Sequence, residues 1–197
     1  ALGAGLLCIF GAGATAAGAA DLPAGGNIVA GSGNIAASGT TLTVNQATAK
    51  MAIDWQSFSI ARGNTVNFVQ PDSSAVALNR VLGADVSVIQ GALKANGQVF
   101  LINPNGIVVG AGARIDTQGF VASTLDMADA DFLAGRLKFL AGPVAGGIRN
   151  DGVITAGPGG KVALIAPDIV NSGIISAPDG QILLAAVKHL HGFVREA

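Results

Sequence analysis

Residues 148–156 read IRNDGVITA, and residues 169–177 read IVNSGIISA. The two segments align without gaps at an offset of 21, and both carry an asparagine and a glycine at matching positions. Further along, residues 160–166 (GKVALIA) align with residues 180–186 (GQILLAA) at an offset of 20. A repeat of this length, built from strand-like segments and Gly or Asn turns, is typical of a solenoid.

The content of each copy indicates which kind of solenoid this is. Each copy holds two or three short strands and lacks the leucine ladder and helical return segment of leucine-rich repeats. We therefore predict an all-β fold, a right-handed parallel β-helix whose rungs of about 20 residues stack about 4.8 Å apart. Asn150 and Asn171, one period apart at a turn, are expected to form a hydrogen-bonded ladder. The inward apolar positions are expected to include Val99, Leu101, Ile154, Val162, Leu164, Ile175, Ile182 and Leu184.

An earlier copy extends the pattern toward the N-terminus. Residues 91–101 (GALKANGQVFL) fit the same frame and lead to Pro104, where the later copy has Pro167. The distance between the two prolines equals three periods of 21, which predicts three rungs. Met127–Phe139 is the segment that suits a helix or an irregular excursion. Residues 26–50 are expected to cap the first rung, because an open strand edge invites aggregation.

A sharp turn follows the strand of this earlier copy. Residues 98–102 alternate in the period-2 pattern of a strand, and the strand stops at Asn103-Pro104-Asn105-Gly106. Pro104 has no amide hydrogen and favours extended geometry at Asn103, while Asn105-Gly106 tolerates positive φ. The asparagine side chains can also hydrogen-bond neighbouring backbone. These four residues predict one well-defined corner.

Residues 1–20 differ in character from the rest of the chain. They carry no charge, and the apolar run at 6–10 (LLCIF) gives way to small residues that end before Asp21. This pattern predicts the remnant of a secretory signal peptide, without its basic n-region and with cleavage near Asp21. Gly11–Ala16 also fits a dinucleotide-binding pattern, but no acidic residue follows about 20 residues on and no crossover helix can be drawn.

Four motifs occur in an order that resembles a known family. They are residues 53–60 (IDWQSFSI), 79–81 (NRV), 98–106 (QVFLINPNG) and 119–126 (GFVASTLD). The order resembles the N-terminal domain of filamentous haemagglutinin, which is the two-partner-secretion (TPS) domain of large bacterial exoproteins. Within that family, the chain is most similar to the high-molecular-weight adhesins. The resemblance runs from Gly26 to Ala186, and the residues after Ala186 depart from the family pattern.

The resemblance implies a fold and a function. It implies a β-helix with an N-terminal β cap and short strands outside the helix. Residues 1–20 would be the signal remnant, and residues 21–197 a TPS secretion domain, the N-terminal fragment of a longer exoprotein. The periplasmic POTRA repeats of an outer-membrane β-barrel transporter would recognise this domain, which would then nucleate the β-helix of its passenger.

The resemblance also implies a location. The exoprotein would pass through the periplasm of a Gram-negative bacterium and end up secreted or on the cell surface. The passenger would be an adhesin, a haemolysin or a contact-dependent toxin, and the sequence does not distinguish these three.

The same resemblance singles out candidate residues for secretion. Trp55 is expected to anchor the core or the cap, and Arg80 to bond turn carbonyls rather than an anion, since its neighbours are apolar. The asparagine corner is either a structural corner or a motif that acts at the transporter or in nucleating the first rungs. The secretion motif comprises Asn103, Pro104, Asn105 and Gly106, with supporting residues Asp54, Trp55, Phe58, Asn79 and Arg80.

Two other functions are compatible with a β-helix. A direct cell-adhesion module would need an exposed aromatic or apolar patch on one face. A polysaccharide-degrading enzyme would need two or three converging carboxylates. The candidate acids instead lie mostly beside turn residues and form no row; they are Asp116, Asp151, Asp168 and Asp179.

Nucleic-acid and metal binding are disfavoured. The net charge is −1 and the 11 basic residues are scattered, so no basic surface is predicted. A calcium site at Asp126, Asp129 and Asp131 would need more oxygen ligands and a tighter spacing. His189 and His191 share one side of a strand without a third ligand. We expect no catalytic residue, no metal and no cofactor.

Overall fold

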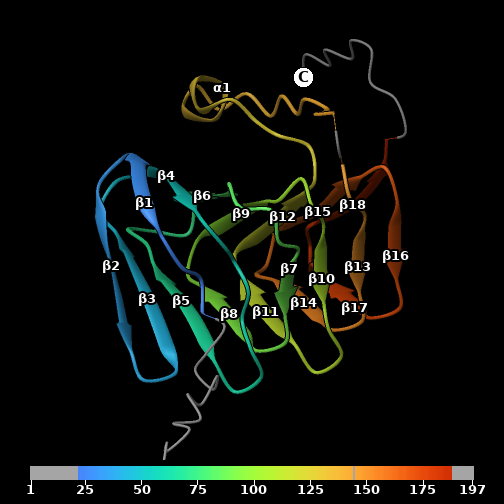
Figure 1. Ribbon diagram of the computed structural model, residues 1–197, viewed down its shortest axis with the longest axis horizontal. Coiled ribbons are helices and arrows are strands. Elements are labelled where there is room, and N and C mark those ends of the chain that lie inside the picture. Colours follow the sequence, from blue (N-terminus) through green and yellow to red (C-terminus); the bar gives the residue numbers. More distant parts are fainter. Residues whose placement is uncertain (1–21, 144, 188–197) are drawn as a thin grey trace, which may run out of the picture.

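The computed structural model describes residues 22–143 and 145–187, which coil into a β-solenoid with three sheets along its length (Figure 1). Sheet I contains, in spatial order, β1 (Asn27–Ala30), β4 (Lys50–Trp55), β6 (Val76–Val81), β9 (Gln98–Ile102), β12 (Gly119–Ser123), β15 (Lys161–Ala166) and β18 (Gln181–Ala186). Sheet II contains β2 (Gly33–Ser38), β3 (Thr41–Gln46), β5 (Thr65–Val69), β8 (Ala92–Ala95), β11 (Arg114–Thr117), β14 (Val153–Ala156) and β17 (Ile174–Ser176). Sheet III contains β7 (Ser87–Ile89), β10 (Ile107–Val109), β13 (Ile148–Asn150) and β16 (Ile169–Asn171).

Each complete rung passes through sheets III, II and I in turn. Strands β13, β14 and β15 make one such rung, and β16, β17 and β18 make the next. Successive rungs pair in parallel, with Ile154 opposite Ile175 and Val162 opposite Ile182. The sequence repeat aligns the same residue pairs, so each copy of the repeat corresponds to one rung of the coil. The parallel β-helix is confirmed, and its right-handed sense stays a prediction.

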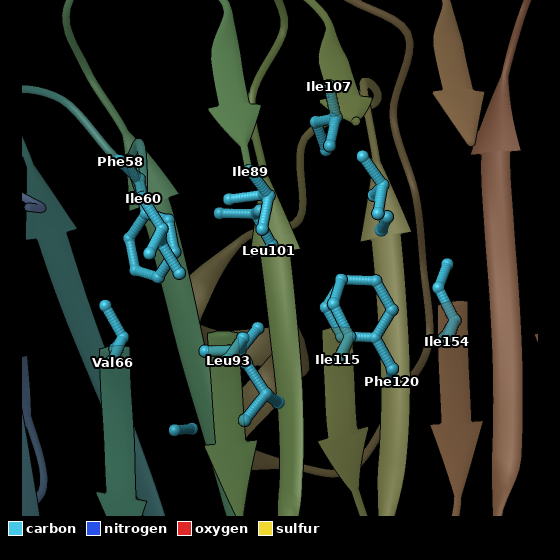
Figure 2. Close-up of a cluster of buried hydrophobic side chains, with 14 of the residues drawn as sticks. Phe58, Ile60, Val66, Ile89, Leu93, Leu101, Ile107, Ile115, Phe120 and Ile154 are labelled. Carbon is cyan, nitrogen blue, oxygen red and sulfur yellow. The ribbon is translucent and has the colours of Figure 1, made fainter. Parts of the chain in front are cut away.

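Apolar side chains from all three sheets meet inside the coil (Figure 2). The predicted inward residues of the middle rungs are fully buried: Val99, Leu101, Ile154, Val162 and Leu164. Ile175 is partly buried against the same cluster. Ile182 and Leu184 stack on Val162 and Leu164 as expected, but they are 49% and 46% exposed. Their predicted inward register is confirmed, and they are exposed because within the described residues no strand stacks on β18.

The distance between the two prolines needs a different explanation from three regular rungs. Ile102 pairs with Ser123, one period further along the chain, but Ser123 pairs with Ile165, two periods further along. The chain from Pro104 to Pro167 therefore makes two rungs, and the second rung contains a long insertion between β12 and β13. The prediction of three rungs was wrong because the inserted segment adds the length of one rung.

The N-terminal cap is built differently from the coil. Strand β1 pairs antiparallel with β4, and β2 pairs antiparallel with β3, whereas the other named strands of the described residues pair in parallel. An N-terminal β cap is thus confirmed. It ends at Ser38, earlier than predicted, since β3 and β4 already belong to parallel rungs.

The insertion, called the excursion below, comprises residues 124–143 and 145–147. It carries the short helix α1 (Asp129–Leu133) and a single antiparallel bridge between Asp126 and Leu140. Within the described residues of the excursion, this bridge takes the place of the short strands that were expected outside the helix. The excursion crosses the outer face of sheet I (Figure 1). Phe132 is buried there, with its ring centroid 6.2 Å from that of Phe100. No helix in residues 22–143 or 145–187 is long and apolar enough to span a membrane.

Candidate functional site

The predicted corner at residues 103–106 connects β9 to β10. The amide of Gly106 donates to the carbonyl oxygen of Asn103 at 3.1 Å, which closes the four-residue turn. Gly106 has a φ of +123°, and a Cβ at this position would lie 3.2 Å from the carbonyl oxygen of Gly147. The backbone angle therefore favours glycine here, and the close neighbour leaves little room for a side chain.

The side chain of Asn103 is fully buried, and its hydrogen-bonding capacity is fully used. Its Nδ2 donates to the carbonyl oxygen of Asp85 and to Ser87 Oγ, each at 2.9 Å. Its Oδ1 accepts from the backbone amide of Asn105 at 3.0 Å and from Asn105 Nδ2 at 3.1 Å. A carboxamide offers two donor hydrogens and two acceptor lone pairs, so none is left for a partner in the folded domain.

The corner joins three parts of the chain that are distant in sequence. Asn105 Nδ2 donates to the carbonyl oxygen of Gly83 at 2.8 Å, which ties the corner to the preceding rung. On the other side, the amide of Gly146 donates to the carbonyl oxygen of Pro104 at 2.7 Å, where the excursion returns to the coil. The predicted side-chain bonds to backbone are confirmed, and most of their partners lie in the rung before rather than in the turn itself.

Three of the supporting residues meet inside the coil. Trp55 Nε1 donates to Asn79 Oδ1 at 3.0 Å, and Asn79 Nδ2 donates to the carbonyl oxygen of Phe100 at 3.2 Å. The rings of Trp55 and Phe58 pack edge to face, with centroids 5.6 Å apart. A Cβ at Gly26 would come within 2.5 Å of the Trp55 ring, so the indole also supports the chain entering the cap. Trp55 is the expected anchor.

The other two supporting residues, Asp54 and Arg80, point out of the coil toward the excursion. Arg80 forms ion pairs with Asp54 at 3.2 Å, Asp126 at 3.0 Å and Asp129 at 2.8 Å, and its Nη2 also donates to the carbonyl oxygen of Met127. Burial lowers the pKa of Arg80, but hydrogen bonds and attraction from the two excursion carboxylates outweigh it, and the pKa stays above its ordinary value.

Turn carbonyls were predicted as the partners of Arg80, and this prediction was wrong. One backbone carbonyl does accept a bond, but three carboxylates hold the guanidinium. Local sequence could not show this, because two of the three acids lie 46 and 49 residues away. Lys50 adds a second attachment, since its Nζ donates to the carbonyl oxygens of Phe132 and Leu133 at the end of α1.

The alternatives to a secretion domain find little support in the geometry. The acids of the proposed calcium site are occupied, with Asp126 and Asp129 on Arg80 and Asp131 on Arg136. The described residues contain no group of three or more His, Cys, Asp or Glu placed to hold a metal. A groove of about 620 Å³ on the outer face of sheet I has no acidic side chain in its lining. His189 and His191, like the dinucleotide-type pattern at Gly11–Ala16, lie outside the described residues.

Two polar ladders run along the corners of the coil. Asn150 Nδ2 donates to Asn171 Oδ1 at 2.7 Å, which confirms the predicted asparagine ladder. A second ladder was missed: Gln70 Nε2 donates to Gln46 Oε1 at 3.0 Å, and Gln70 Oε1 accepts from the amide of Gly97 at 3.0 Å. The signal in the sequence is a glutamine at the end of two successive strands of sheet II, since Gln46 ends β3 and Gln70 directly follows β5.

Comparison with known proteins agrees with this architecture. The family model described as the TPS secretion domain matches residues 19–192. Two heme/hemopexin-binding proteins of Haemophilus influenzae, one from strain KW20 Rd, are 47% and 48% identical over 115 and 86 residues. These alignments cover 58% and 44% of this chain but only 13% and 9% of the relatives.

A solved structure extends the match to three dimensions. The crystal structure of the HMW1 secretion domain from Haemophilus influenzae superimposes with a TM-score of 0.79 at 37% identity, covering 83% of this chain and 44% of that one. TPS secretion domains are non-enzymatic, and their exoproteins are secreted by Gram-negative bacteria through a TpsB transporter. The family match, the HMW1-like fold and the ordered motifs lead to one conclusion: this chain belongs to the TPS secretion domain family.

Proposed function

We propose that residues 21–197 are the N-terminal secretion-targeting and β-helix-nucleating domain of a large exoprotein, and that residues 1–20 are the remnant of its signal peptide. The observation that carries this proposal is the family match across residues 19–192. The signal peptide takes the chain to the periplasm, and the POTRA repeats of an outer-membrane β-barrel transporter recognise the secretion domain there. The exoprotein is then released or held at the cell surface.

Folding one rung at a time supports the proposed role of the domain in nucleating the β-helix. In a solenoid each rung contacts only its neighbours, so stability accumulates one rung at a time. Outside the cell, each new rung buries apolar side chains on the previous one, which draws the chain outward and prevents its return. The last described rung presents Ile182 and Leu184 on its exposed end, where the rungs of a passenger would stack.

The Asn103–Gly106 motif acts, in this proposal, before or during folding. Its support is the burial of Asn103 and the complete use of its amide, which leave a transporter nothing of that side chain to bind once the corner has formed. In the unfolded chain the same asparagines are free. The alternative is that the motif serves only as a corner and affects secretion only through stability.

Secretion and stability measured on the same variants separate these views. Asn103→Ala leaves the bonding groups of Asp85 and Ser87 unpaired, so we expect it to destabilise the domain by about 2 kcal/mol. Ile154→Val is a core control expected to cost about 1 kcal/mol. The proposal predicts that Asn103→Ala and Asn105→Ala lose secretion through the partner transporter far beyond what the control's stability loss explains. Secretion that follows stability alone, or stays normal, would leave the motif a structural corner.

A direct adhesive role is a second candidate with one observation in its favour. Two exposed leucines, Leu137 of the excursion and Leu183 of β18, line the groove on sheet I and give it the apolar surface that adhesion requires. Leu133 and Leu140 of the excursion are exposed as well. Attachment of the purified domain to host cells, compared with a Leu137→Ser variant, tests this role. Equal binding by both proteins, or none by either, would remove it.

The names of the relatives suggest a role for the longer protein. We propose that its passenger takes part in binding haem or hemopexin, as the heme/hemopexin-binding proteins of Haemophilus influenzae do by their name. The described residues contain no histidine or cysteine, and their methionines, Met51 and Met127, are fully buried, so this part of the chain offers none of these side chains to a surface haem. We expect a haem titration of a domain variant with His189 and His191 replaced by alanine, followed by its Soret absorbance, to show no specific binding, and saturable binding would move the site into this domain.

A further inference from the structure

Strand β2 is an open edge in the cap. Among the strands of residues 22–143 and 145–187, it is the terminal strand of sheet II and pairs only with β3, on one side (Figure 1). Five of its six residues are exposed. Because an edge strand presents a row of unpaired amide and carbonyl groups, it is a template for another strand.

Edge strands usually carry devices that prevent such pairing, and β2 has none of them. The register between β2 and β3 is regular over six residue pairs, whereas β1, the edge strand of sheet I in the cap, is shorter and has an irregularity between Ile28 and Ala30. The strand reads GNIAAS, without a proline or a charged residue. No charge occurs anywhere between Asp21 and Lys50. Charged side chains, prolines, bulges and short length are the features that protect edges elsewhere.

The hairpin geometry identifies the groups on the free edge. Strands β2 and β3 are joined by the two residues Gly39 and Thr40, with Ser38 opposite Thr41, and Gly39 has a φ of +56°. In a two-residue hairpin the closing pair is hydrogen-bonded, and bonded pairs then alternate along the ladder. Bonded positions on β2 are thus 38, 36 and 34. The amides and carbonyls of Gly33, Ile35 and Ala37 point to the open side.

The β2–β3 hairpin also differs from the rest of the coil in how locally it forms. Its pairs join residues 33–38 to residues 41–46, whereas the other paired strands of the described residues lie about one rung or more apart in sequence. A hairpin of this kind can form while the remainder of an exported chain is still unfolded. An isolated two-stranded hairpin is only marginally stable, and a third strand stabilises it.

We propose that the free edge of β2 is the place where a strand of the transporter's periplasmic domain adds to this chain. The proposal rests on the proposed function and specifies the surface for it. Strand addition obtains affinity from main-chain hydrogen bonds, and the small uncharged side chains of β2 do not oppose it. The hairpin begins at Gly33, shortly after the expected cleavage point at Asp21, which makes it the first local structure that a transporter meets.

A proline placed on the open side tests the edge. Ala37→Pro removes an outward amide that bonds nothing in the domain, so the folded domain should keep its melting temperature. Ala37→Ser is the matched control, because it retains the amide. We expect Ala37→Pro to weaken binding of the chain to the purified periplasmic domain of its transporter at least tenfold and to reduce secretion, while Ala37→Ser behaves as wild type.

The possible outcomes are distinct. Unchanged binding by Ala37→Pro overturns the edge proposal but leaves the proposed function intact, whereas failure of the wild-type chain to be secreted by its transporter overturns the proposed function. Light scattering after size exclusion would reveal dimers of the free chain. Dimers abolished by Ala37→Pro would assign the edge to self-association instead. If Ala37→Pro does not fold, Ala37→Lys, which charges the edge and keeps the backbone, must show the same loss of binding for the proposal to hold.

Discussion

The two faces of β4 and β6 differ in how they are held. On the inner face, Trp55 and Asn79 lie in successive rungs and share a hydrogen bond within the apolar core. On the outer face, one residue further along β6, Arg80 binds the excursion, whose acids follow it by 46 and 49 residues. Adjacent residues thus serve contacts of different kinds. The inner contact forms when two rungs stack, but the outer contact waits for the six strands β7 to β12, which precede the excursion in the chain.

This difference predicts an order of assembly. The inner face can form progressively as each rung is added, because its contacts join neighbouring rungs. The outer contacts of Arg80 and Lys50 require β4, β6, β9 and β12 in place before the excursion can dock. Inner-face residues should therefore determine whether the domain folds, and outer-face residues should determine how slowly it unfolds.

The largest effect is expected from Trp55→Ala on the inner face. Removing the indole leaves a cavity beside Phe58 and beneath the cap, and substitutions of this size in a core cost about 3–5 kcal/mol. Urea unfolding of the purified domain measures the loss, with Trp55→Phe as the control that retains an aromatic ring. A loss below about 1 kcal/mol would mean that the cap is not anchored by this residue.

Asn79→Ala should give the next largest effect. The substitution leaves the buried indole N–H of Trp55 and the carbonyl oxygen of Phe100 without their partner, which costs about 1–3 kcal/mol. In the double variant with Trp55→Phe the indole donor is absent, so the two losses should be less than additive. Full additivity would contradict a direct coupling of the two side chains.

Arg80→Met on the outer face should have a smaller effect of a different kind. Asp126 and Asp129 are about half exposed and regain water, so we expect a loss of only about 1–2 kcal/mol. Because the excursion docks late, the loss should appear as unfolding about tenfold faster with refolding unchanged. Stopped-flow kinetics checks this, with Arg80→Lys as a partial replacement. Slower refolding would show that the excursion docks before the transition state.

The smallest effect is expected at an ion pair that lacks such burial. Asp151 raises the pKa of Arg149 through a hydrogen bond at 2.6 Å, but the Arg149 side chain is 55% exposed, against 14% for Arg80. Pairs in this setting contribute little to stability. Arg149→Ala should leave the melting temperature unchanged at low and at high salt. A clear decrease would mean that outer-face ion pairs stabilise the coil even without the excursion above them.

Much of the molecule could be read from local chemistry. The repeat period predicted the rung, the parallel register and the inward ladders, because every rung repeats the same contacts with its neighbour. The corner at Asn103–Gly106 followed from proline and glycine backbone preferences. The burial of Trp55 followed from its size among apolar neighbours.

Contacts that do not recur at the repeat spacing could be seen only in the tertiary structure. The carboxylates around Arg80 come from an excursion whose path no repeat describes, and the same excursion left room for two rungs rather than three between Pro104 and Pro167. The exposure of Ile182 and the open edge of β2 depend on which strands lie beside them, not on their own residues. Sequence determines contacts that recur at a fixed spacing, whereas contacts at arbitrary spacing exist only once the chain has taken one path in space.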